Sequence, residues 1–162
     1  SKPSEILTML DKEIFSTLNQ NLELGVSNDG MDIVVCEFTL KNRHIRFASA
    51  MRPVLIVLGG EIYYIKGNRA SVGGQSVLEK YFDDQEYYLN EGDAIYLFSD
   101  GFPDQFGGPD GKKMKVARLK NFISEIFNLP VDKQEEALVR FFKEWKGDYD
   151  QVDDVLFMGV KV

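Results

Sequence analysis

Two acidic motifs stand directly beside apolar runs that are typical of buried strands. Asp100 follows the apolar run 95–98, and Asp153 opens an Asp-Asp pair that precedes the apolar run 155–160. Carboxylates that meet at the end of a sheet repel one another unless a divalent cation neutralises them. Because the donors are hard oxygens without His or Cys, the pattern favours Mg²⁺ or Mn²⁺ over zinc.

A purely structural interpretation of both motifs stays open. Asp-Gly is a common turn dipeptide, and an Asp pair before a strand can belong to a solvated, capping loop. An unrelated α+β ligand-binding domain with turn aspartates would fit this interpretation. It requires Asp100 and Asp153 to lie well beyond about 10 Å apart, whereas two-metal sites space their ions by about 3.5–4 Å.

Other chemistries find little support in the sequence. His44 is the single histidine and has no nucleophile motif near it, which predicts an ordinary strand residue. Cys36 is the single cysteine and lies in an apolar run, which predicts a buried, inert thiol. The net charge of −7 and the pI near 4.8 disfavour nucleic acid as a partner.

The length and hydropathy of the chain indicate one soluble domain. Its 162 residues, 44% of them hydrophobic, are enough for one core. No apolar stretch approaches the roughly 20 residues of a membrane span, and the first residues do not resemble a signal peptide. We therefore expect no membrane partner for this segment and a cytoplasmic location.

The elements that must position the aspartates follow from hydrophobic periodicity. Spacings of three and four predict a helix over 3–20, and two more helices around 116–126 and 137–145 that are separated by Pro130. Short β-rich segments paired as hairpins predict strands over 31–39, 44–49, 54–58, 61–66, 82–89 and 94–98. The final run, 155–160, is apolar on both faces and predicts a central strand.

Four segments together resemble the SpoIIE-like branch of the PP2C-type metal-dependent serine/threonine phosphatases. They are residues 29–33, 48–53, 91–108 and 153–156, and the stretch from Gly92 to Gly108 is the most specific. The resemblance implies an α+β fold, an αββα sandwich of two mainly antiparallel sheets flanked by helices. It also implies that residues 1–162 form a single, N-terminally truncated phosphatase domain.

The resemblance carries over site residues by position. Asp100 and Asp153 match the metal-binding aspartates, Asp104 matches an accessory metal position, and Gly101 and Asp154 belong to the site loops. The implied cofactor is a pair of Mn²⁺ or Mg²⁺ ions that lowers the pKa of a bound water. The implied substrate is a phosphoserine or phosphothreonine on a regulatory protein, within bacterial sensory or two-component signalling.

The sequence departs from the family pattern at three places. The Asp-Gly metal motif that relatives carry before the first helix is absent, Leu156 replaces a usual Thr or Ser, and Arg52 stands where many relatives have Gly-His. We therefore expect a metal site that is incomplete and a fragment that is weakly active or inactive. Exposed sheet edges predict a homo-oligomer. The alternative function is a pseudophosphatase that acts as a protein-interaction module.

Overall fold

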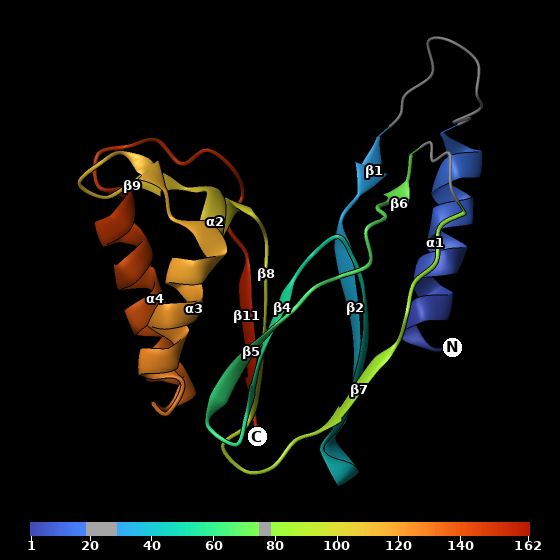
Figure 1. Ribbon diagram of the computed structural model, residues 1–162, viewed down its shortest axis with the longest axis horizontal. Helices are drawn as coiled ribbons and strands as arrows, with labels where there is room; N and C mark the ends of the chain where they lie inside the picture. The colour runs from blue at the N-terminus through green and yellow to red at the C-terminus, as the bar shows by residue number, and fades with distance from the viewer. Residues whose placement is uncertain (19–28, 75–78) are drawn as a thin grey trace. The chain divides into compact units, whose positions relative to one another are not determined.

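The computed structural model describes residues 1–18, 29–74 and 79–162, and it divides into two compact units (Figure 1). Unit 1 comprises residues 1–53 and 66–89, and unit 2 comprises residues 54–65 and 90–162. Each contains an antiparallel sheet and at least one α-helix, so the predicted α+β class with mainly antiparallel sheets is confirmed.

Unit 1 places one helix on a three-stranded sheet of order β2-β3-β7. Helix α1 begins at Pro3, a residue suited to the first helical turn, where the Lys2 amide donates to Glu5 Oε2 at 2.9 Å. Its apolar stripe packs on one face of the sheet in a cluster around Leu7, Ala48 and Val72. The elements are α1 (Pro3–Thr17), β1 (Gly30–Met31), β2 (Ile33–Thr39), a 3₁₀ turn (Leu40–Asn42), β3 (His44–Ala50), β6 (Val72–Gly73) and β7 (Gln85–Tyr88).

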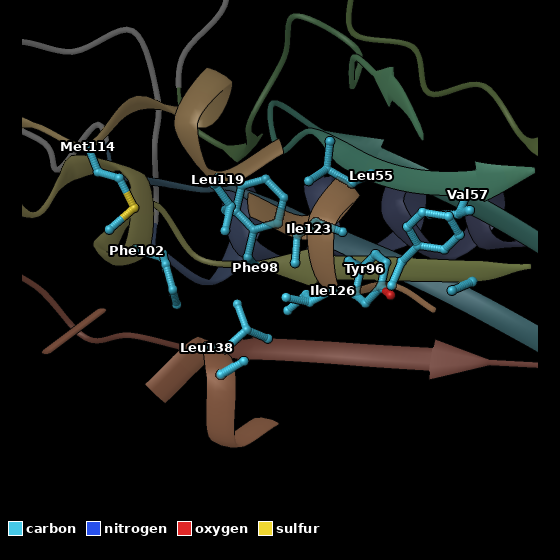
Figure 2. Packing of buried hydrophobic residues seen from close by; sticks show 13 residues of the cluster. Leu55, Val57, Tyr96, Phe98, Phe102, Met114, Leu119, Ile123, Ile126 and Leu138 are labelled. Carbon is cyan, nitrogen blue, oxygen red and sulfur yellow. The ribbon is translucent and has the colours of Figure 1, made fainter. Parts of the chain in front are cut away.

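Unit 2 contains a four-stranded antiparallel sheet of order β11-β8-β4-β5. Its elements are β4 (Val54–Leu58), β5 (Glu61–Ile65), β8 (Ala94–Phe98), α2 (Gly101–Asp104), β9 (Phe106–Gly107), β10 (Lys112–Lys113), α3 (Lys115–Ile126), α4 (Val131–Lys146) and β11 (Phe157–Lys161). Alternate residues of β4 and β8 face α3 and α4, as the period of two in a strand requires. Figure 2 shows this core, which includes Leu55, Tyr96, Leu119 and Leu138.

Buried hydrogen bonds fix the corner between α3 and α4. Gln134 Nε2 donates to the carbonyls of Phe127 and Leu129, at 3.0 and 2.8 Å. The Tyr96 hydroxyl on β8 donates to Gln134 Oε1 at 2.8 Å. Because Gln134 is thereby satisfied at both ends of its amide, the helical corner is tied to the middle of the sheet.

Most expected elements lie where the sequence predicted them. The helix expected over 3–20 ends at Thr17, and residues 19 and 20 lie outside the described part of the chain. The strand expected over 82–89 is shorter, at Gln85–Tyr88. His44 is an ordinary residue of β3, as predicted, with Nε2 3.1 Å from Glu86 Oε2.

Two expectations about burial were wrong. Cys36 is exposed, because the C-terminal half of β2 is covered less than its apolar neighbours suggested. The run 155–160 does not form a central strand: within the described residues β11 pairs with β8 alone and lies at the edge of its sheet. Met158, on the face opposite Phe157, is 51% exposed. An apolar pattern on both faces of a strand therefore does not determine how many strands pair with it.

Burial of Tyr96 makes the stability of unit 2 depend on alkaline pH. Desolvation raises the pKa of Tyr96 to about 12 and outweighs the opposite effect of the hydrogen bond to Gln134. The neutral phenol is favoured in the folded state, so its stabilisation is complete below the unfolded pKa of about 10 and is lost as pH rises towards about 12.

We expect Tyr96→Phe to destabilise the protein by about 1–3 kcal/mol near neutral pH, because Gln134 Oε1 loses its donor. Between about pH 10 and 12 the wild type should lose up to about 1.4 kcal/mol per pH unit relative to the variant. Urea unfolding of both proteins across this range measures the difference. A constant difference would contradict the assigned burial.

Candidate metal site

Strand β8 and the short helix α2 position the first acidic motif. The chain leaves β8 after Phe98 and turns directly into α2, where the Asp104 amide donates to the Asp100 carbonyl at 2.8 Å. Phe102, inside this turn, is buried, and its ring centroid lies 5.1 Å from that of Phe142 and 5.6 Å from that of Phe157. This apolar anchor therefore holds Asp100 and Asp104 at the two ends of one helical turn.

Gly101 brings the two acidic motifs into contact. A Cβ atom on Gly101 would lie 2.3 Å from the carbonyl oxygen of Asp154 and 3.2 Å from that of Asp153. Only a residue without a side chain allows this approach. Given a spacing of about 3.8 Å between successive Cα atoms, the backbones of Asp100 and Asp153 cannot lie much more than about 10 Å apart. This contact disfavours the interpretation of both motifs as unrelated turns.

Two hydrogen-bonding side chains tie the same segments together. Ser99 Oγ donates to the Asp154 carbonyl at 2.8 Å and accepts from the Leu156 amide at 2.9 Å. Gln105 Nε2 donates to the Asp150 carbonyl at 2.8 Å. Ser99 and Gln105 thus stand on either side of α2, and each bonds to the loop that carries Asp153.

The side chains of these acidic motifs have partners within the fold. Asp104 pairs with Lys113 at 2.8 Å, and both side chains are about half exposed. Asp153 Oδ1 accepts from the Asp154 amide at 2.7 Å, and Asp100 is half-buried. In the described ranges no group of three or more His, Cys, Asp or Glu side chains is arranged to hold a metal ion.

The donor set nevertheless fits a hard divalent cation. All the candidate donors are carboxylate oxygens, the class that Mg²⁺ and Mn²⁺ prefer. Gln105 is not one of these donors, but its buried Oε1 has no hydrogen-bond partner among the described residues. The turn that carries Asp100 and Asp104 thus has one unsatisfied hydrogen-bond acceptor next to it. A buried acceptor without a partner costs free energy.

One protein-family model covers the whole chain. The family model for stage II sporulation protein E, SpoIIE, matches residues 1–162. The chain belongs to the SpoIIE family. A search of curated protein sequences found no match.

Solved structures extend the likeness of this SpoIIE-family chain to PP2C domains. The SiaA-PP2C domain of Pseudomonas aeruginosa superimposes with a TM-score of 0.85 at 27% identity, over 99% of this chain and 61% of that one. The phosphatase domain of SpoIIE from Bacillus subtilis, presoaked with Mn, gives a TM-score of 0.61 at 15% identity, over 98% of this chain and 72% of that one. The RsbU and RsbW domains of Rv1364c from Mycobacterium tuberculosis give a TM-score of 0.73 at 17% identity, over 99% of this chain and 42% of that one.

These similarities confirm the predicted PP2C-like fold. The chain spans 61% of the Pseudomonas domain, so the relative carries further sequence that this chain does not match. Among the helices of the described residues, none has the length and hydropathy that a membrane span requires.

The sequence indicated the aspartates but not the residues that join them. The resemblance pointed to Gly101 and Asp154 as site-loop residues, and the structure places them in contact. Ser99 and Gln105 were missed because their partners lie 55 and 45 residues away in the chain. Their positions directly before Asp100 and directly after Asp104 are the only local signal that marks them.

We expect Gly101→Ala to destabilise the protein by at least about 2 kcal/mol, because its methyl group would overlap the Asp154 carbonyl. Gly59→Ala is the control: its φ of 58° strains the backbone but nothing lies within 4 Å of the added atom, so about 1 kcal/mol is expected. Chemical denaturation compares the two. Equal losses would show that the contact at Gly101 has no special tightness.

Proposed function

We propose that residues 1–162 are one partial phosphatase domain of a metal-dependent phosphoprotein phosphatase. Its substrate would be a phosphoserine or phosphothreonine on a regulatory protein, and it would serve as the output domain of a bacterial signalling protein. The observation that carries the proposal is the contact of Gly101 with the Asp153-Asp154 backbone. Membership in the SpoIIE family supports the same chemistry.

The proposed metal ligands are Asp100 and Asp153, with Asp104 as an accessory ligand. When bound, Mn²⁺ or Mg²⁺ would activate a water for attack on phosphorus and neutralise phosphoryl charge. Asp104 first has to exchange its ion pair with Lys113 for a metal, which is feasible because exposed pairs contribute little free energy. The B. subtilis relative was presoaked with Mn, which supports the choice of ion.

The three acidic side chains leave the ligand set short of what two metals need. Hard divalent ions take six or more oxygen ligands, and paired ions share carboxylates that bridge them. We therefore propose that residues 1–162 alone turn over substrate weakly or not at all, although they retain metal affinity.

A pseudophosphatase that binds proteins is the second candidate. Two observations favour it: no three of the described carboxylates are arranged to hold a metal, and one of them is already paired with Lys113. The two candidates differ in whether the chain binds a divalent ion at Asp100.

Calorimetric titration with Mn²⁺ separates these candidates. We expect the wild type to bind Mn²⁺ and Asp100→Asn to bind at least about tenfold more weakly, since it loses a charged ligand. Asp132→Asn, in the exposed first turn of α4, is the matched control and should bind as the wild type does. Equal binding by all three proteins would place any bound ion elsewhere and favour the pseudophosphatase.

We further propose that residues 1–162 form a homodimer through the edge of β11 that faces away from β8, where no described residue pairs with it. The Leu156 carbonyl and both backbone groups of Val162 bond toward β8. Because backbone direction alternates along an antiparallel strand, Phe157, Gly159 and Lys161 direct their N–H and C=O groups to the open edge. A two-fold axis at Gly159 would pair Met158 of one copy with Val160 of the other, which is apolar against apolar.

We expect Met158→Lys to shift the protein from dimer to monomer, because an edge lysine opposes strand pairing. Leu40→Lys, at a residue that is 81% exposed in unit 1, is the control and should stay dimeric. Sedimentation velocity measures both. A wild type that is monomeric at every concentration tested would contradict the proposed edge pairing.

A further inference from the structure

Two hydrogen-bonding residues, Ser99 and Gln105, connect the segment that carries Asp100 and Asp104 to the loop that carries Asp153. Ser99 and Gln105 flank Asp100 and Asp104 on the segment 99–105. Ser99 bonds to the backbone of Asp154, and Gln105 bonds to that of Asp150. Asp153 lies between those two partners.

We propose that Gln105 is a positioning residue that holds the loop 150–154 against α2, so that Asp153 and Asp100 can share a metal ion. This inference rests on the metal-binding function proposed above. Gln105 acts through the backbone of Asp150 and is not itself assigned as a ligand.

The surroundings of Gln105 make it a rigid anchor. Its side chain is fully buried. Its backbone carbonyl accepts hydrogen bonds from Trp145 Nε1 at 2.9 Å and from the Met114 amide at 3.0 Å. The Gly108 amide donates to the Trp145 carbonyl at 2.8 Å, which fixes the following turn against α4. A Cβ atom on Gly107 would lie 1.8 Å from that same carbonyl, so the chain is tightly seated on both sides of Gln105.

The chemistry of the amide suits an anchor in an acidic region. Its Nε2 donates to the carbonyls of Phe106, at 2.9 Å, and Asp150 without adding charge beside the aspartates. A glutamate would offer only acceptors to those carbonyls and would add a negative charge. A lysine could pair with a carboxylate and compete with the metal. Glutamine alone of these three holds the loop without adding charge or pairing with a carboxylate.

The unpartnered Oε1 makes it possible to test a positioning role of Gln105 apart from a stabilising one. Gln134, the other buried glutamine of unit 2, is bonded at both ends of its amide, whereas Gln105 leaves its Oε1 without a partner among the described residues. A buried acceptor without a donor costs free energy. Methionine has a similar shape, so Gln105→Met removes the clamp together with this unfavourable group, and Gln134→Met is the matched control.

The test measures Mn²⁺ affinity by calorimetry, amide hydrogen exchange of residues 150–156 without metal, and the unfolding midpoint, all on residues 1–162. We expect Gln105→Met to weaken Mn²⁺ binding by roughly tenfold or more, as loss of an orienting group does. We also expect it to speed exchange across 150–156. Gln134→Met should lower the unfolding midpoint further than Gln105→Met and leave both other readouts at their wild-type values.

Each outcome decides a separate point. Unchanged exchange over 150–156 in Gln105→Met would overturn the clamp, and faster exchange with unchanged Mn²⁺ affinity would overturn its link to the metal. A wild type whose Mn²⁺ binding is absent or insensitive to Asp100→Asn contradicts the proposed function instead. The exchange comparison, which needs no metal, then still decides whether Gln105 holds the loop.

Discussion

The approach of Gly101 to the carbonyl of Asp154 is the constraint on which the candidate site depends. Strand β8 can deliver Asp100 to the sheet end, and the loop before β11 can deliver Asp153, but a side chain at position 101 would hold the two segments apart. The buried side chain of Phe102 fixes the turn that carries Asp100 in the core. The antiparallel pairing of β8 with β11 fixes how far the two segments lie from each other.

Electrostatics explains why the segments are joined through neutral groups. Four aspartates, at positions 100, 104, 153 and 154, lie on two touching segments, and like charges at this range oppose one another. Ser99 and Gln105 supply hydrogen bonds without further charge, while Lys113 balances Asp104 on the exposed side. A divalent cation bound between the two segments would relieve the remaining repulsion.

Local pattern determined how much of the fold could be predicted. Strands β4 and β8 and helices α3 and α4 were found because periodicity and turn residues are properties of adjacent residues. Helix α2 was missed because Gly-Phe-Pro-Asp is too short for a helical period. The position of β11 was wrong because the choice of strand neighbours is a long-range matter that residue types on two faces do not encode.

The candidate site divides in the same way. Residue type and order singled out Asp100 and Asp153, and the family resemblance added Asp104, Gly101 and Asp154. The pairing of Asp104 with Lys113 and the bond from Gln105 to Asp150 needed the folded chain, because side-chain partners are not visible in spacing.

Paramagnetic broadening by Mn²⁺ in the amide NMR spectrum tests the central claim most directly, that one cation binds where the two acidic segments touch. At Mn²⁺ well below one equivalent, the amide signals of Gly101 and Asp154 should broaden together and before those of exposed acidic residues such as Asp132. Broadening of only one of the two segments, or of exposed acidic residues first, would contradict a shared metal site.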